Sequence, residues 1–387
     1  MSGERRIGII GASASGIYTA LLLSLKANDC RITLFDRTDK IGKKILATGN
    51  GHCNLLHSPF DPDAYNRPSI IRKIYAKVGQ DGLQQALESL GIETLTKGEL
   101  VYPLSYSAAS FVRHLGNLLV RQGIDVHLEE RVTDVQDKKV ITDKGVYEFD
   151  AVVFAFGGKS QPNLGSDGSM FDIVERLGYR VIPLEPGLCP LRCPDVPKSL
   201  AGVRHSARIR LLSDKGRYEE VGEVLFKKDG VSGICIMNAS LFFGKDCSLD
   251  IDFFPELSRD ELAAKLLSAM ERYGDDFLVP FFEKPLCDFY RNHLRIAAEM
   301  PLNFKKAQFF AMRMKSFTLH PTARYDFAES QVTIGGVSLA EVDSHFRAFK
   351  NLDHYFVGEC LDVHGLCGGH NLGFALLSAI VVSEVLA

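Results

Sequence analysis

The segment Gly11-Ala12-Ser13-Ala14-Ser15-Gly16 decides the fold of the first part of the chain. It follows an apolar stretch over 6–10, which predicts a strand, and precedes an apolar periodic stretch over 14–27, which predicts a helix. A glycine-rich turn between a strand and a helix directs backbone N–H groups and the helix N-terminus at an anion. The spacing is that of the GxGxxG phosphate loop, except that Ser13 replaces the second glycine.

An acidic residue at the end of the next strand supports a dinucleotide at this loop. The apolar run RITLF ends at Asp36, 20 residues after Gly16. A carboxylate at this place hydrogen-bonds ribose hydroxyls and disfavours a 2′-phosphate. A β–α turn without a ligand is the alternative. Strand, loop, helix and acid are all in register, so we expect a bound dinucleotide, with the Ser13 hydroxyl donating a hydrogen bond where the pyrophosphate approaches.

Composition places the chain among soluble globular proteins. It has 387 residues, of which 46% are hydrophobic and 24% charged, and a formal net charge of −3. That length predicts two or three packed units, and that charge gives no general attraction to nucleic acid or to an anionic membrane. The nine cysteines form no CxxC pair, so we expect no disulfide framework and no metal site. Glycines and serines interrupt the apolar stretch up to Leu25, which argues against a signal peptide, and no window reaches the ~20 apolar residues of a membrane span. We therefore expect a cytoplasmic protein.

The pattern along the chain changes twice. Helices are predicted over 70–78, 82–90 and 108–121, a strand over 125–128, a β-meander over 131–149 and a buried parallel strand over 151–158. Short β-like stretches then appear over 186–254 (ARIRLL, EVLFK, GICIM, SLDIDF) with no strong helix, which predicts a small β-barrel or sandwich. Helical periodicity follows over 258–312 and opens with a capping-box spacing of Ser258 and Glu261. From 332 the first pattern returns, with a strand over 355–357 and a last helix from about Gly369.

These changes predict an α/β protein with one Rossmann domain that is split by an insertion. The predicted boundaries are 1–185 and 326–387 for the Rossmann domain, 186–254 for an inserted β-barrel subdomain and 255–325 for an inserted helical subdomain.

Five ordered segments carry a more specific likeness. They are DKIGKKILATGNGHCN (39–54), the stretch AFGGKS to GLCPL (155–191), GEVLFKKDGVSGI (222–234), VTIGGVSLAEVD (332–343) and YFVGECLDVHGLCGGHNLGFALLSA (355–379). Together they resemble the BaiN/YhiN-like family of NAD(P)/FAD-dependent oxidoreductases, also described as aminoacetone-oxidase-like flavoproteins. The likeness runs from Ile7 to the C-terminus and is weakest over about 240–310.

The resemblance implies FAD, held by a glutathione-reductase-like Rossmann domain that an inserted β-barrel and a helical subdomain interrupt. It implies that Lys43 and Lys44 lie near the pyrophosphate, that Val132 contacts adenine, and that the first residues of the last helix pack at the isoalloxazine edge. The cofactor-binding residues predicted from the motif and the resemblance are Gly11, Ser13, Ala14, Ser15, Gly16, Asp36, Arg37, Lys43, Lys44, Thr48, Gly49, Asn50, Gly51, Asn54, Val132, Gly157, Gly158, Gly358, Glu359, Gly369, His370, Asn371 and Leu372.

Three departures from the family pattern concern the substrate more than the cofactor. The usual GGGRCN-like run is Gly49-Asn50-Gly51-His52-Cys53-Asn54 here, the usual Thr-His before a Gly-x-Ser-Gly motif is Lys227-Lys228-Asp229, and His370 stands where a tyrosine is usual. We expect FAD binding to survive these changes, whereas the substrate pocket need not be shared.

The residues available for chemistry limit the reaction. Only Cys53 lies where disulfide reductases of this fold carry two cysteines, so we expect no flavin–disulfide relay and interpret Cys53 as a packing thiol. The sequence has no second GxGxxG with a following acid, so NAD(P)H docks transiently or the substrate itself supplies electrons. Candidate proton donors are His370, His364 and His52, with His370 first because it begins a helix beside the cofactor. Asp362 is expected to orient its loop.

The leading hypothesis is an FAD-dependent reductase that passes hydride to a conjugated C=C of a small organic or ring substrate, with NAD(P)H as donor. The alternatives are an FAD-dependent oxidase of small amines, a flavin-dependent rRNA uridine reductase, a non-enzymatic flavin-binding protein and a plain NAD dehydrogenase. The expected partner is a small molecule, with no membrane and no DNA; RNA is disfavoured by the net charge. An RNA substrate would need a basic surface from Lys227–Lys228, Arg204–Arg210, Lys305–Lys306, Arg313 and Lys315. Substrate identity, electron donor and oligomeric state stay open.

Overall fold

The structure is a computed structural model that describes residues 4–27, 29–293 and 303–387. The chain forms two compact units, one of Met1–Pro186 with Ser330–Ala387 and one of Gly187–Glu329. Each unit has its own cluster of buried apolar side chains. The finer boundaries predicted from the sequence stay a prediction.

The first unit is built on a five-stranded parallel sheet in the order β20-β10-β1-β2-β6. Its strands are β1 (Arg5–Ile10), β2 (Cys30–Phe35), β6 (Asp125–His127), β10 (Ala151–Phe154) and β20 (His354–Phe356). The central strands are continuous apolar runs because both faces of the sheet are covered, and Ile10 lies between Phe35 and Phe154 in register. Successive strands are added on one side of β1 and then on the other, which makes the β1/β10 boundary a topological switch point.

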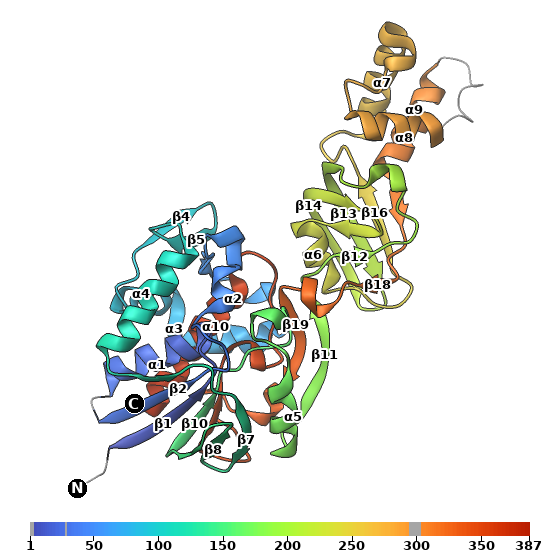
Figure 1. Ribbon diagram of the computed structural model, residues 1–387. Coiled ribbons are helices and arrows are strands. Elements are labelled where there is room, and N and C mark those ends of the chain that lie inside the picture. Colours follow the sequence, from blue (N-terminus) through green and yellow to red (C-terminus); the bar gives the residue numbers. More distant parts are fainter. Residues whose placement is uncertain (1–3, 28, 294–302) are drawn as a thin grey trace. The chain divides into compact units, whose positions relative to one another are not determined.

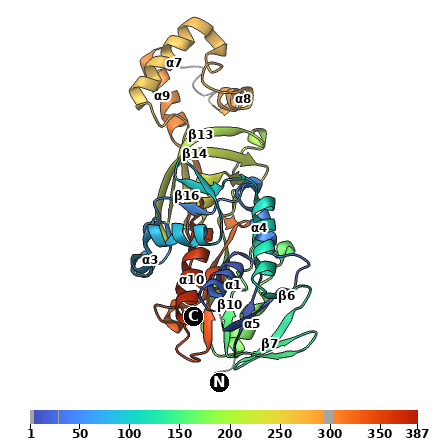
Figure 2. The same cartoon turned by 90° about the vertical axis from the view of Figure 1, so that its left-hand side faces the viewer.

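Two helices far apart in sequence lie side by side against this sheet (Figures 1 and 2). They are α1 (Ala14–Lys26), which follows the glycine-rich loop, and α10 (His370–Leu386), the last helix. Nearly all of α10 is buried, which explains its uniformly apolar sequence. The helix α4 (Ala108–Arg121) packs beside α1 and has the predicted bounds. The two helices predicted over 70–78 and 82–90 form one interrupted element, α3 (Pro68–Ser89), which bends at Gly79 with φ 70°.

Small sheets complete the first unit. The predicted meander is confirmed as β7 (Val132–Gln136), β8 (Lys139–Thr142) and β9 (Val146–Glu148), and its Tyr147 ring lies 5.0 Å from the Phe35 ring of β2. The remaining elements are the sheet of β3 (Leu56–His57), β5 (Leu100–Pro103) and β4 (Thr94–Lys97), the pair of β11 (Val181–Gly187) and β19 (Val332–Val337), and the helices α2 (Lys43–Leu46) and α5 (Ser169–Arg176).

The second unit contains a seven-stranded sheet in the order β17-β16-β13-β14-β15-β12-β18. Its strands are β12 (Leu191–Arg192), β13 (Arg204–Ser213), β14 (Gly216–Lys227), β15 (Gly230–Ser232), β16 (Ser248–Asp252), β17 (Phe317–Leu319) and β18 (Ala323–Arg324). One sequence prediction was wrong here, because the apolar stretch GICIM belongs to a helix, α6 (Ile234–Ser240). A short, fully apolar run does not distinguish a buried strand from a buried helix by periodicity. Gly233, at φ 115°, ends the extended backbone just before the helix.

The helical part of the second unit agrees with the sequence pattern. It comprises α7 (Arg259–Tyr273), α8 (Lys284–His293) and α9 (Phe304–Lys315). The capping box is confirmed, since Glu261 N donates to Ser258 Oγ at 3.2 Å and Ser258 N donates to Glu261 Oε2 at 2.8 Å. The part of the predicted helical stretch over 294–302 lies outside the described residues. Of the helices in the described ranges, none has both the length and the apolar character needed to cross a membrane.

Candidate functional site

The predicted cofactor segments meet at one edge of the parallel sheet. Each follows the carboxyl end of a strand, with Gly11 after β1, Asp36 after β2, Gly157 after β10 and Gly358 after β20. In open α/β sheets, ligands bind outside the carboxyl ends of the strands at the switch point. The fold therefore brings together residues that the sequence spreads over more than 300 positions.

The phosphate loop requires glycine at two positions for steric reasons. Gly11 has φ 114°, and a Cβ on it would lie 2.4 Å from Ala155 O. A Cβ on Gly16 would lie 1.9 Å from Gly11 O, so a side chain there would break the strand–helix turn. Ser13 is the N-cap residue of α1, and its carbonyl accepts the Ile17 N–H at 2.9 Å. The N–H groups that precede Ile17 in the first turn of α1 have no acceptor within a helix, and they form a cradle for an anion.

Asp36 is fixed by backbone donors beside this cradle. Its Oδ2 accepts the Ala12 N–H at 2.8 Å, and its Oδ1 accepts from Thr38 N at 2.8 Å and Thr38 Oγ1 at 2.7 Å. An ionised carboxylate has about four acceptor sites. Asp36 therefore retains acceptor capacity toward ribose hydroxyls while the loop holds it in place.

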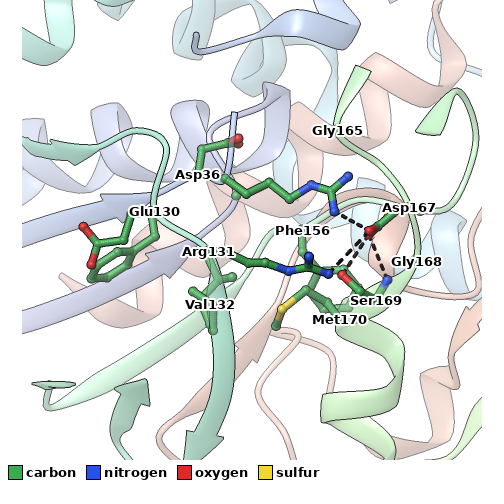
Figure 3. Close-up of a pocket in the computed structure, with 15 residues that line it drawn as sticks. Asp36, Glu130, Arg131, Val132, Phe156, Gly165, Asp167, Gly168, Ser169 and Met170 are labelled. Atoms are coloured by element: carbon green, nitrogen blue, oxygen red, sulfur yellow. Dashed lines mark hydrogen bonds and ion pairs between the residues drawn. The ribbon is translucent and has the colours of Figure 1, made fainter. Parts of the chain in front are cut away.

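A pocket with about 490 Å³ of empty space, partly open to solvent, adjoins Asp36. In Figure 3, Asp167 lies beside Ser169 and the end of the Arg131 side chain. Asp167 forms an ion pair with Arg37 and lies 3.6 Å from Arg131. Burial raises the pKa of Asp167, but hydrogen bonds from Ser169 and the Arg37 ion pair outweigh this effect and lower the pKa overall. The lining residues are Ile10, Gly11, Phe35, Asp36, Arg37, Glu130, Arg131, Val132, Phe156, Gly158, Gly165, Asp167, Gly168, Ser169 and Met170.

The sequence prediction missed part of this pocket. Val132, a predicted adenine contact, lines the pocket, whereas Arg131, Asp167 and Ser169 also line it and were not predicted. The glycine-flanked turn Gly165-Ser-Asp-Gly168 before α5 was the available signal, because such a turn brings backbone and short polar side chains close to a ligand.

The two predicted lysines differ in their partners. Lys43 pairs with Asp39 at 2.6 Å on the surface. Lys44 donates to Glu359 Oε2 at 2.7 Å, which joins two predicted cofactor residues from opposite ends of the chain. Glu359 Oε1 also accepts the Thr333 N–H at 2.8 Å.

Gly158 has a local reason to be glycine besides the cofactor. A Cβ on Gly158 would lie 2.2 Å from Thr333 Oγ1. That hydroxyl oxygen accepts the Lys159 N–H at 2.7 Å and the Ser160 N–H at 3.1 Å. Gly158 therefore makes room for a side chain that organises the turn after β10.

A second group of predicted residues gathers at the start of α10. The amide of Asn54, oriented to satisfy both neighbours, donates to Leu56 O at 3.2 Å and accepts the Gly369 N–H at 3.1 Å. This links the Thr48–Gly51 turn to the N-cap of α10. Asn371 Oδ1 accepts the Gly365 N–H at 2.9 Å, so Asn371 fixes the loop that precedes the helix.

The three predicted histidines occupy different environments. His52 is partly exposed, stacks on the Tyr106 ring at 3.9 Å and places Nδ1 2.9 Å from Tyr106 O. His364 is buried, and its backbone N–H donates to Asn66 Oδ1 at 3.0 Å. His370 is 5% exposed, and burial is the main reason that its pKa falls to about 4. His370 is therefore neutral near neutral pH, which argues against a resting imidazolium at this position.

Asp362 and Cys53 have the environments expected of structural residues. Asp362 is buried and forms an ion pair with Arg67, so it ties the loop after β20 to the start of α3. Cys53 is fully buried, and burial raises the pKa of its thiol to about 12. A thiol with that pKa stays protonated at neutral pH and is a poor nucleophile.

The sheet edge, the first turn of α1 and the Asp36 carboxylate together fit one class of ligand, a dinucleotide. Gly11 and Gly16 leave the space that a Cβ would fill, and Asp36 is held where a ribose would reach it. The class of protein that this fold and site define is a Rossmann-type dinucleotide-binding protein.

Comparisons with known proteins agree with this class. Residues 5–385 match the family described as HI0933-like protein Rossmann domain. The chain is 31% identical to the 3-dehydro-bile acid delta(4,6)-reductase of Clostridium scindens, over 99% of each chain. It is 26% identical to the ribosomal RNA dihydrouridine synthase of Haemophilus influenzae, over 96% of each chain. Among solved structures it resembles a 3-ketosteroid-delta4-(5alpha)-dehydrogenase from Rhodococcus jostii (TM-score 0.53, 12% identity, 100% of this chain and 98% of that chain), a likeness of fold.

The chain belongs to the HI0933-like Rossmann family. This confirms the family resemblance, the Rossmann fold class and the assignment as an FAD-dependent oxidoreductase.

Proposed function

We propose that the chain is a reductase that passes hydride from reduced FAD to a C=C bond conjugated with a carbonyl group in a small ring-shaped substrate, and that NAD(P)H is the electron donor. The observation that carries this proposal is the 31% identity, over 99% of both chains, to a protein whose name describes reduction of a 3-dehydro-bile acid. FAD, when bound, supplies the hydride. The chain must then bind FAD, orient the substrate and provide one proton for the carbon next to the carbonyl group.

Cofactor binding follows from the residues at the sheet edge. The first turn of α1 would hold the pyrophosphate, Asp36 the ribose, and the pocket beside Arg131 and Asp167 the adenine. The Lys44–Glu359 pair would lie between this end and the start of α10.

His52 is our proposed proton donor among the three candidates. Because a carbonyl oxygen only accepts, His52 Nδ1 must donate to Tyr106 O, which leaves Nε2 to carry the exchangeable proton. His52 is partly exposed and can recover its proton from water. His370 is less suited to this role because burial lowers its pKa to about 4.

Charge pairing disfavours RNA as the substrate. Several of the basic residues that could form an RNA surface on the second unit pair with acidic neighbours. Arg208 and Arg210 both approach Glu219, at 3.6 and 3.1 Å, and Arg204 pairs with Glu223 at 2.5 Å. Binding to phosphates would have to compete with these carboxylates.

The electron donor is proposed from the sequence, which carries one dinucleotide fingerprint that FAD would occupy. NAD(P)H would then dock transiently and leave before the organic substrate enters.

The test is an anaerobic two-step reduction of the FAD-loaded protein. In the first step, NADPH or NADH should bleach the flavin absorbance. In the second step, a steroid with a 3-keto-4-ene group should restore the flavin absorbance. Mass spectrometry should then show that the steroid has gained two hydrogen atoms. Turnover of small amines with O₂, without NAD(P)H, would replace the proposal by an oxidase. Reoxidation by a uridine-containing rRNA fragment and not by the steroid would replace it by the RNA reductase.

A further inference from the structure

A histidine that no sequence motif marked lies against His370. His57, in β3, stacks on the His370 ring with the centroids 4.5 Å apart and the planes 18° from parallel. Its side chain is 18% exposed, whereas His370 is buried at the first residue of α10. The two rings are therefore in direct contact, but His57 is the more exposed of the two.

The hydrogen bonds of His57 define where it can take up a proton. Its Nδ1 lies 3.0 Å from Pro59 O, and because that carbonyl only accepts, Nδ1 carries hydrogen. Its Nε2 lies 3.4 Å from Glu99 Oε2. A proton added at Nε2 therefore meets a carboxylate, although the exposed Glu99 side chain attracts it weakly.

His370 has the opposite environment. Among the described residues, its Nδ1 has no hydrogen-bond partner. Burial and the neighbouring His57 both lower its pKa, while the carboxylate of Asp61 has a smaller opposite effect. Tyr65 meets the ring edge-on at 5.7 Å, and its hydroxyl donates to His370 O at 2.6 Å.

Two imidazolium rings at this separation would repel each other strongly, so the pair carries at most one positive charge. Glu99 faces His57 Nε2, and solvent reaches His57 but hardly reaches His370. A proton added to the pair therefore resides on His57.

We propose that His57 is a positioning residue that holds the His370 ring at the start of α10 and carries the single positive charge of the pair, so that it sets the charge beside the isoalloxazine ring. The inference rests on the proposed placement of that ring at the start of α10. A positive charge there would stabilise the reduced flavin, which gains negative charge on reduction. The effect requires the added proton on His57, so it is larger at low pH than at high pH.

The test measures the midpoint potential of bound FAD in the wild type and in His57→Gln, at about pH 6 and about pH 8. We expect a roughly tenfold fall in the equilibrium constant for reduction at the lower pH, about 30 mV for a two-electron couple, and no change at the higher pH. His320→Gln, at an exposed histidine of the second unit, is the control and should match the wild type at both pH values.

Three outcomes would overturn the inference. His57→Gln could follow the wild type at both pH values, or it could shift the potential equally at both, which would indicate a structural effect. If His57→Gln loses FAD, His57→Phe keeps a stacking ring without a proton and should give the same pH-dependent shift. Loss of FAD in both variants would also contradict the inference, because it would make His57 necessary for holding FAD. No organic substrate is involved, so the result is independent of the proposed reaction.

Discussion

The two ends of the proposed FAD site are built in different ways. The adenosine end comprises the Gly11–Gly16 loop, Asp36 and Asp167. It is defined by backbone geometry, because two glycines make the turn and backbone N–H groups fix the Asp36 carboxylate. The flavin end, comprising Thr48–Asn54, His57 and Gly369–Leu372, is defined by side chains from separate segments that meet only in the folded chain.

This difference implies different sensitivities. A change at the adenosine end should affect folding and FAD binding together, because the same contacts serve both. A change at the flavin end should alter proton supply and reduction potential while FAD stays bound. Substitutions at the two ends therefore test whether their sensitivities differ in this way.

The largest effect is expected for Gly16→Ala. The added Cβ would lie 1.9 Å from Gly11 O, a contact with backbone that a rotamer change cannot relieve. We expect a destabilisation of about 3 kcal/mol or more and loss of FAD. Gly123→Ala is the control, since Gly123 also lies in the first unit, has φ 66° and has no atom within 4 Å of its Cβ position. It should cost about 1 kcal/mol. Urea unfolding and FAD content measure both, and equal losses would contradict the steric explanation.

The same contrast explains how much the sequence could predict. The phosphate loop, the parallel strands and Asp36 were predictable because local spacing alone determines a strand–turn–helix with an acid at the next strand end. The meander and the capping box at Ser258 were equally local. Two contacts were not predictable, namely the pairing of Arg37 with Asp167 and the stacking of His57 on His370. In each, the two residues lie far apart in the sequence and no periodic pattern relates them. The helix α6 was missed because an apolar run of this length is ambiguous.

At the flavin end, His52→Gln should separate catalysis from binding. Glutamine can donate to Tyr106 O but cannot supply a proton, so kcat for reduction of the steroid should fall about 100-fold while FAD content is unchanged. His345→Gln, at an exposed histidine of the same unit, should retain full activity. Stopped-flow reoxidation of the reduced protein measures the step directly. A reoxidation rate within about twofold of the wild type would transfer the acid role to His364 or His370.

The pH dependence of stability tests the burial of His370. Its pKa is about 4 in the folded chain, against 6.5 for an unperturbed histidine side chain, so the unfolded chain binds more protons between these values. The His370 contribution to folding stability therefore falls as the pH decreases, by about 2 kcal/mol between about pH 7 and about pH 5.

His370→Phe removes this contribution while keeping an aromatic ring beside His57. The decrease in unfolding free energy between the two pH values should become smaller by about 2 kcal/mol in the apo-protein, as measured by urea titration. His354, whose pKa burial also lowers, contributes to the same loss in both proteins and cancels in the comparison. Identical pH dependence in the two proteins would show that His370 is solvated and would remove the contrast between it and His57.

The smallest effect is expected for Asp36→Asn, which keeps the shape of the side chain and removes its charge. The amide keeps one acceptor oxygen, but its NH₂ group replaces the other carboxylate oxygen. Ala12 N and Thr38 N are both donors, so one of these two hydrogen bonds is lost. We expect FAD to bind about tenfold more weakly, about 1.4 kcal/mol. Asp39→Asn, at the exposed partner of Lys43, should change affinity less than about twofold. If both variants bound FAD like the wild type in a fluorescence titration, the ribose would not rest on Asp36, and the adenosine end would depend on the helix N-terminus alone.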